Sequence, residues 1–255
     1  MQPILRTLLA SAACAGILSP AFAADASTGP IKNIVLVHGQ FADASGWKPV
    51  YDILTQDGYN VSLVQPPETS LPDDVAATQR VLAQQNGPAI LVGHSYGGAI
   101  ITEAGNDAHV AGLVYIAAHM PDDGESTGFN KNKMPGLIKS IKTTADGFLY
   151  IDPAHFHADF AADLPAAQAE WMSHAQVMPA AIVNNTPITH AAWHTKPTWY
   201  MVAKQDHTIS PDLERVYAAR AHSHTVEVDG AHTIYISQAK AVAQMIEQAA
   251  QTAAQ

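Results

Sequence analysis

The stretch ILVGHSYGGAI, residues 90–100, joins an apolar run to a serine that lies between glycines. Its centre fits the pattern G-x-S-x-G, which is typical of a sharp turn from a strand into a helix with a reactive serine at its tip. Gly93 and Gly97 would let that turn close, because larger side chains would collide there. We therefore interpret Ser95 as a nucleophile. The alternative is a small residue that only packs in a turn.

Strand and helix patterns alternate on both sides of this turn. The predicted strands are 32–39, 60–65, 88–93, 109–118, 197–203 and 224–230. The predicted helices are 45–58 (with Ser45 as its N-cap), 71–87, 97–105, 210–221 and 237–250. The strands are apolar throughout, which is typical of a parallel sheet covered on both faces. We therefore predict an α/β fold with a mostly parallel, doubly wound sheet.

The alternation stops between residues 119 and 196. A helical pattern covers 164–178, and tryptophans and methionines recur in this region. We expect a helical cap, approximately 119–196, inserted after the strand that follows the nucleophile helix. The side chains predicted to contact a substrate are Phe41, Trp171, Met172 and Trp193. Those that belong to the cap fit its own core equally well.

Composition limits the classes of function. The chain has 255 residues, of which 47% are hydrophobic and 14% are charged, enough for one large globular domain. Its formal net charge of −10 argues against nucleic acid as a partner, since phosphate binding requires clustered Lys and Arg. Cys14 is the single cysteine, so residues 24–255 contain neither a disulfide nor a thiol nucleophile.

The N-terminal segment differs from the rest of the chain. Residues 1–23 carry one early cation, Arg6, then a short apolar stretch and the sequence AFA, which fits a secretory signal and its cleavage site. The apolar run is too short to span a bilayer. We therefore expect a signal peptide at 1–23 and one domain at 24–255. The protein is expected to be secreted or periplasmic, and free of the membrane after cleavage.

A nucleophilic serine needs a base, and the base needs an orienting acid. His232 follows the last predicted strand, and Asp206 follows the preceding one. The carboxyl ends of parallel strands meet at one edge of a sheet, so both side chains are expected near Ser95. Asp122 and Asp123 also follow a strand and are the alternative acids. The order Ser95, Asp206, His232 is the one expected of a triad in such a sheet.

The loop after the first strand, HGQF, is expected to complete an oxyanion hole. The backbone N–H groups of Gln40 and Tyr96 are the predicted donors, with Phe41 as the alternative to Gln40. Gly39 would let this loop approach the serine closely. We interpret His38 as a structural residue beneath the loop. The alternative role for His38 is a second base.

Four motifs occur in order along the chain: VLVHGQFADASGW, LVGHSYGG, KQDHTISPDLE and GAHTIYIS. Together they resemble the alpha/beta-hydrolase superfamily over residues 31–250. Within it, the chain is similar to the branch of plant methyl esterases, hydroxynitrile lyases and bacterial esterase-like relatives. The resemblance implies the triad and oxyanion roles given above and no cofactor. It implies a reaction class and not a substrate.

The expected function is hydrolysis of a small to medium neutral carboxylic ester through an acyl-enzyme. A neutral substrate is favoured because the cap contains few lysines and no arginine to pair with a carboxylate. The first alternative is a lyase of the hydroxynitrile-lyase type. Such lyases typically carry Lys after the histidine and lack the first-loop glycine, whereas this chain has Thr233 and Gly39. The second alternative is a ligand-binding protein on the same fold.

Two pairs of alternate histidines invite a metal interpretation, since alternate residues of a strand share a face. They are His155 with His157 and His222 with His224. No cysteine or acidic cluster accompanies them in the sequence, so we expect no metal. The expected partner is a small-molecule ester.

Overall fold

The computed structural model describes residues 29–253. The expected signal peptide, 1–23, lies outside the described residues. The central element is a six-stranded parallel sheet with the strand order β2-β1-β3-β4-β7-β8. Its strands are β1 (Asn33–Val37), β2 (Asn60–Val64), β3 (Ala89–Ser95), β4 (Val110–Ala118), β7 (Thr198–Ala203) and β8 (His224–Val228). The predicted parallel sheet is confirmed.

Alternate residues of each inner strand build two apolar layers. In β1, Val35 and Val37 join the cluster of buried side chains on one face of the sheet, whereas Ile34 and Leu36 join the cluster on the other. All four side chains are fully buried. A strand without a polar face is stable only when both of its faces are covered, which explains the apolar runs in the sequence.

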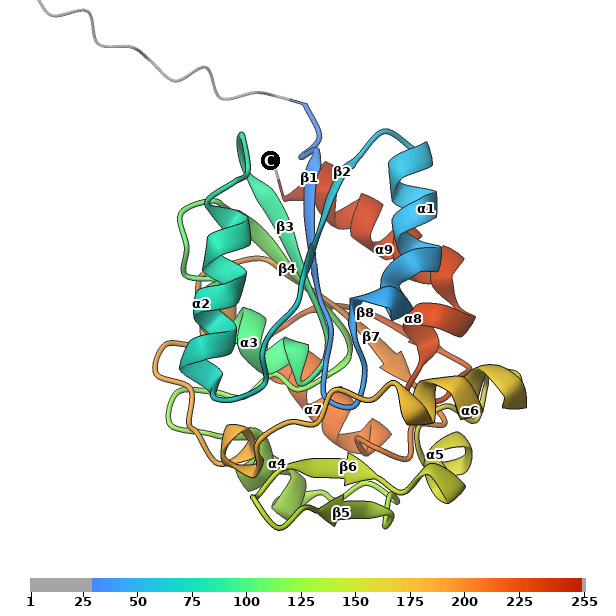
Figure 1. Cartoon of the computed structure of the whole chain (residues 1–255). Helices are drawn as coiled ribbons and strands as arrows, with labels where there is room; N and C mark the ends of the chain where they lie inside the picture. The colour runs from blue at the N-terminus through green and yellow to red at the C-terminus, as the bar shows by residue number, and fades with distance from the viewer. Residues whose placement is uncertain (1–28, 254–255) are drawn as a thin grey trace, which may run out of the picture.

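Helices cover both faces of the sheet (Figure 1). One layer contains α2 (Leu71–Leu82), α3 (Gly97–Ala104) and α7 (Pro211–Arg220). The other contains α1 (Lys48–Gln56), α8 (Ile234–Ser237) and α9 (Ala239–Thr252). The doubly wound arrangement is therefore confirmed. None of the helices in the described part of the chain is long and apolar enough to span a bilayer.

The first helix begins later than the sequence predicts. A 3-10 turn, η1 (Ala44–Trp47), precedes α1, and the Asp43 carboxylate accepts a hydrogen bond from the backbone N–H of Ser45 at 2.6 Å. Ser45 is therefore capped and is not itself the N-cap. A carboxylate also adds a favourable negative charge at the start of a helical segment.

The cap lies between β4 and β7. It contains α4 (Thr127–Lys133), α5 (Pro153–Asp159), α6 (Ala166–His174), the short turns η2 (Ala181–Asn184) and η3 (Ala192–His194), and a two-stranded antiparallel sheet of β5 (Ile141–Thr143) and β6 (Leu149–Ile151). Sequence patterns predict a helix at 164–178, where α6 lies, but do not predict α4, α5 or this small sheet. Figure 1 shows α4, α5, α6 and the small sheet grouped at one end of the main sheet. A third apolar cluster joins the cap to the loop after β1 through Phe41 and Phe160.

Candidate active site

The nucleophile turn forms where β3 ends at Ser95 and α3 begins at Gly97. Ser95 has a φ of +55°, a left-handed conformation that is uncommon for a residue with a side chain. A Cβ on Gly93 would lie 2.5 Å from the carbonyl oxygen of Gly97, and one on Gly97 would lie 2.7 Å from that of His38. The turn therefore needs glycine at both positions.

Ser95, His232 and Asp206 meet at the carboxyl edge of the sheet. The Nε2 atom of His232 lies 2.7 Å from Ser95 Oγ, and its Nδ1 atom lies 2.5 Å from Asp206 Oδ2. All three side chains are buried. The second oxygen of Asp206 accepts backbone N–H hydrogen bonds from Thr208 at 2.6 Å and Ile209 at 2.9 Å, which fixes the carboxylate. The structure thus brings together the three residues of the predicted triad.

This arrangement is suited to general-base chemistry. With Asp206 accepting a hydrogen bond from Nδ1–H, the Nε2 atom of His232 faces the Ser95 hydroxyl and can take its proton. Another buried acid, Glu214 on α7, lies near the triad. Burial, and then the charge of Asp206, raise the pKa of Glu214 well above its usual value. Glu214 therefore retains its proton more strongly than an exposed glutamate does.

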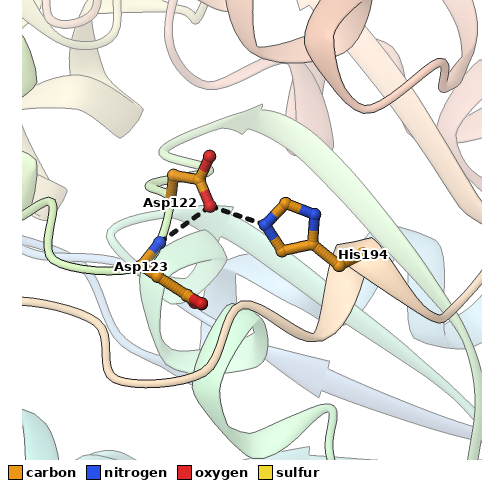
Figure 2. A group of neighbouring side chains, drawn as sticks. All are labelled: Asp122, Asp123 and His194. Carbon is orange, nitrogen blue, oxygen red and sulfur yellow. Dashed lines mark hydrogen bonds and ion pairs between the residues drawn. The ribbon is translucent and has the colours of Figure 1, made fainter.

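The alternative acids Asp122 and Asp123 lie in a different cluster. In the cluster drawn in Figure 2, His194 Nε2 contacts Asp122 Oδ1, which also accepts the backbone N–H of Asp123. The two distances are 2.6 Å and 2.8 Å. The Asp123 carboxylate accepts the N–H of Ala191 at 2.6 Å. Within residues 29–253, these three side chains are the one group close enough to share a metal ion. Asp122 and Asp123 therefore bond to the segment 191–194, and the carboxylate that contacts His232 is that of Asp206.

The loop after β1 lies against the nucleophile turn. A Cβ on Gly39 would lie 2.5 Å from Ser95 Cβ and 3.0 Å from the backbone nitrogen of Tyr96. In the described chain, the N–H groups of Gln40 and Tyr96 donate to no backbone acceptor. Unpaired N–H groups beside the nucleophile are what an oxyanion hole requires. Phe41, the alternative to Gln40, has a φ of +63° and places its side chain in the apolar cluster under the cap.

A buried polar chain supports this region. The Tyr96 hydroxyl donates to Asp74 Oδ2 at 2.8 Å, and Asp74 Oδ1 accepts the backbone N–H of Glu68 at 2.6 Å. Burial raises the pKa of Asp74 to about 6, although the bond from Tyr96 acts in the opposite direction. Burial, and then the nearby Asp74, raise the pKa of Glu68 well above its usual value. Sequence patterns place Asp74 in the first turn of a helix and give no signal of this contact.

Two further histidines are buried beside the triad. His38 contacts the carbonyl oxygen of Gly39 and the side-chain oxygen of Gln65, each at 3.0 Å. The Nε2 atom of His94 lies 2.8 Å from the carbonyl oxygen of His232. Burial lowers the pKa of both rings, so their neutral forms are favoured. Each ring therefore fixes a loop of the site, which is the role that the sequence favours for His38.

Three of the four predicted substrate-contacting residues share one cavity. Phe41, Trp171 and Met172 line a hollow of about 180 Å³, together with residues of η1, α1 and α8. The Trp171 side chain is 59% exposed, so its indole is accessible to a ligand. Trp193 does not line this hollow. It is buried, and its indole N–H donates to the carbonyl oxygen of Pro121 at 2.9 Å, so the structure does not bring it together with the other three. The side chains of the triad do not line this hollow either.

Two cap residues near the triad were not predicted as site residues. The Phe160 ring packs edge-on against His232, with ring centres 5.0 Å apart, and meets Phe41 at 6.4 Å. Lys131 on α4 is half-buried. Burial lowers its pKa, and the charge of Asp206 acts in the opposite direction. The irregular cap sequence contains no periodic signal that would separate these residues from their exposed neighbours.

Comparisons with known proteins agree with this fold. The model of the alpha/beta hydrolase family matches residues 34–245. The alpha/beta hydrolase nvfD of Aspergillus novofumigatus is 24% identical over 202 residues, which cover 72% of this chain and 80% of that protein. A solved pyrethroid hydrolase from Sphingobium faniae is 21% identical with a TM-score of 0.75, covering 87% of this chain and 98% of that one. Solved polyneuridine aldehyde esterase is 16% identical with a TM-score of 0.73, covering 86% and 98%.

Proposed function

This chain belongs to the alpha/beta hydrolase family, and on that premise we propose that it is a serine esterase. The proposed substrates are small to medium neutral carboxylic esters, which are cleaved through an acyl-enzyme. The observation that carries the proposal is the continuous contact from Asp206 through His232 to Ser95, with distances of 2.5 Å and 2.7 Å. This arrangement activates a hydroxyl that is otherwise a weak nucleophile.

In the proposed first half-reaction, His232 Nε2 takes the proton of Ser95 Oγ while that oxygen attacks the ester carbonyl carbon. The carbonyl oxygen becomes an oxyanion, and the N–H groups of Gln40 and Tyr96 stabilise it. The bond to the alcohol oxygen then breaks, and the alcohol leaves with the proton held by His232. The acid part of the substrate stays bonded to Ser95 Oγ as an ester.

Water completes the second half-reaction. His232 takes a proton from a water molecule, whose oxygen attacks the acyl carbon. Ser95 Oγ leaves and recovers its proton from His232. Each turnover consumes one water and releases one carboxylic acid and one alcohol, and these steps use no cofactor.

The surroundings of the triad support a neutral and partly apolar substrate. Phe41, Phe160 and Met172 belong to one buried apolar cluster, and Phe160 reaches the ring of His232. A substrate carboxylate would lose hydration against these side chains, whereas apolar groups would gain roughly 0.8 kcal/mol for each buried CH₂. Two similar structures are named as a pyrethroid hydrolase and an esterase, which supports ester cleavage as the reaction.

A fluorophosphonate probe and p-nitrophenyl esters of graded chain length test the proposal. We expect the wild-type protein to be labelled at one site and to hydrolyse the esters. Ser95→Ala should fold normally, resist labelling and lose on the order of 10⁴-fold or more in kcat. Burst kinetics that persist in Ser95→Ala would refute the nucleophile. Cleavage of cyanohydrins without ester hydrolysis would favour a lyase, and an unlabelled wild type that binds esters without turnover would favour a binding protein.

A further inference from the structure

The loop that carries the catalytic histidine is bonded to the cap through one carboxylate. Asp163 lies between α5 and α6 and is half-buried. Its Oδ2 atom accepts the backbone N–H of Ala231 at 3.0 Å and the hydroxyl of Ser237 at 2.5 Å. Its Oδ1 atom accepts the hydroxyl of Thr233 at 2.7 Å. Two of these three donors are the residues directly before and after His232.

The Asp163 carboxylate and the histidine loop lie in close contact at Gly230. A Cβ on Gly230 would lie 3.0 Å from Asp163 Oδ2 and 2.6 Å from Cγ2 of Ile234, so a larger residue at this position would push the loop away. The carbonyl oxygen of Gly230 accepts the N–H of Gln205 at 3.0 Å. This bond links the histidine loop to the loop of Asp206. A shift at Asp163 would therefore reach both the base and its acid.

Neighbours of Asp163 also contact the loop of the catalytic acid. The Nδ1 atom of His207 lies 3.2 Å from the carbonyl oxygen of Ala158, and the Thr208 hydroxyl donates to the carbonyl oxygen of Asp159 at 3.0 Å. Residues 158–163 therefore contact both of the loops whose side chains must align with the nucleophile. We call these residues the clamp segment.

We propose that Asp163 is a positioning residue that sets the place of His232 relative to Ser95. The inference rests on the proposed function, because it concerns the efficiency of the same triad. Hydrogen bonds to a carboxylate are stronger than those between neutral groups, and here they hold the residues on both sides of His232, through a backbone N–H of Ala231 and the hydroxyl of Thr233. Without them, the place of the imidazole would depend on Asp206 at its ring, on His94 at the His232 carbonyl oxygen and on the packing of Phe160. A displacement of about 1 Å costs on the order of 100-fold in rate.

Three variants test the positioning role. Asp163→Ala removes every acceptor, and we expect kcat for a p-nitrophenyl ester to fall about 10- to 100-fold while KM changes by less than about threefold. Thr233→Val keeps the side-chain shape and deletes one donor, so it should lose about threefold to tenfold in kcat. Thr233→Ser keeps the hydroxyl and should retain the wild-type kcat.

Asp152→Ala is the matched control within the cap. Its carboxylate also accepts a backbone N–H, from Ala154 at 3.1 Å, but that bond is the N-cap of α5. The control should keep the wild-type kcat even where its thermal unfolding midpoint falls as far as that of Asp163→Ala. A comparison of the two variants therefore separates positioning of His232 from stability of the cap.

The outcomes distinguish this inference from the proposed function. A wild-type protein that is neither labelled nor active on any ester would overturn the proposed function, and the positioning role with it. An active wild type with Asp163→Ala within about threefold of its kcat would overturn the positioning role alone. Equal losses in Asp163→Ala and Asp152→Ala would also overturn it, because general loosening of the cap would then be sufficient. A kcat loss in Asp163→Ala and Thr233→Val that Thr233→Ser does not share supports it.

Discussion

A methyl group at position 39 tests whether catalysis requires the present separation between the loop after β1, which carries Gln40, and the nucleophile turn. In Gly39→Ala, the new Cβ would lie 2.5 Å from Ser95 Cβ, 2.7 Å from the carbonyl oxygen of His94 and 3.0 Å from the backbone nitrogen of Tyr96. None of these atoms is the end of a flexible side chain. The backbone of one partner must therefore move.

The size of that movement sets the expected loss. The tightest contact must open from 2.5 Å to the 3.4 Å of an ordinary contact, a shift of about 0.9 Å. A misplacement near 1 Å costs about 100-fold in rate, and loss of one oxyanion donor costs about 100- to 1000-fold. We expect kcat of Gly39→Ala to fall within that range. Overpacking should also lower the free energy of unfolding by about 1 to 3 kcal/mol.

Steady-state hydrolysis of a p-nitrophenyl ester, with urea unfolding of the same samples, measures both effects. Gly87→Ala is the control, because its Cβ would meet only Asn33 Nδ2, at 3.8 Å. This control should keep the wild-type kcat. A folded Gly39→Ala protein with kcat within about threefold of wild type would refute the reasoning, since the oxyanion donors would then tolerate the displacement.

Three further predictions concern the acid, the buried polar chain and the substrate. Asp206→Asn should lower kcat by about 10³- to 10⁴-fold, whereas Asp122→Asn should stay near wild type because Asp122 is bonded to His194. A larger loss in Asp122→Asn than in Asp206→Asn would show that the catalytic acid lies in the earlier loop. Burial raises the pKa of Asp74 from 3.8 to about 6. The unfolded chain therefore releases this proton at a lower pH than the folded protein does, and the free energy of unfolding falls as pH rises between these two values. Wild type should lose about 2 kcal/mol relative to Asp74→Asn between about pH 4.5 and 7.5 in urea unfolding, and a constant difference would contradict the shift. A neutral ester should have a higher kcat/KM than its ω-carboxylate counterpart at low and high salt; a preference for the anion that Lys131→Met abolishes would show a cationic subsite instead.

The main sheet and the triad could be predicted because their signals are local. An apolar strand such as β1 has few stable environments other than a sheet covered on both sides, and Gly93 and Gly97 mark the sharp turn within five residues. His232 and Asp206 each follow a predicted strand directly. Their meeting point follows from the rule that the carboxyl ends of parallel strands share one edge.

The cap could not be predicted to the same depth, because its contacts join residues that are distant in the sequence. Phe160 and Asp163 lie about 70 residues before the histidine loop that they contact, with no motif around them. Trp193 shows a different limit of the sequence. An aromatic residue in an irregular segment fits a pocket as well as a core, and only its hydrogen bond to Pro121 separates the two.

The clamp segment, residues 158–163, limits how this protein can be recombined with its relatives. A cap inserted between two strands is an obvious unit to transplant when a new substrate range is wanted. Here, a chimaera that exchanges the whole of 119–196 would also replace the segment that accepts hydrogen bonds from Thr208, two residues after the acid, and from Thr233, directly after the base. The chimaera would then have a new cap around a triad that the contacts of Asp163 no longer position. The transplantable unit is therefore the cap on either side of the clamp segment, with 158–163 left in place.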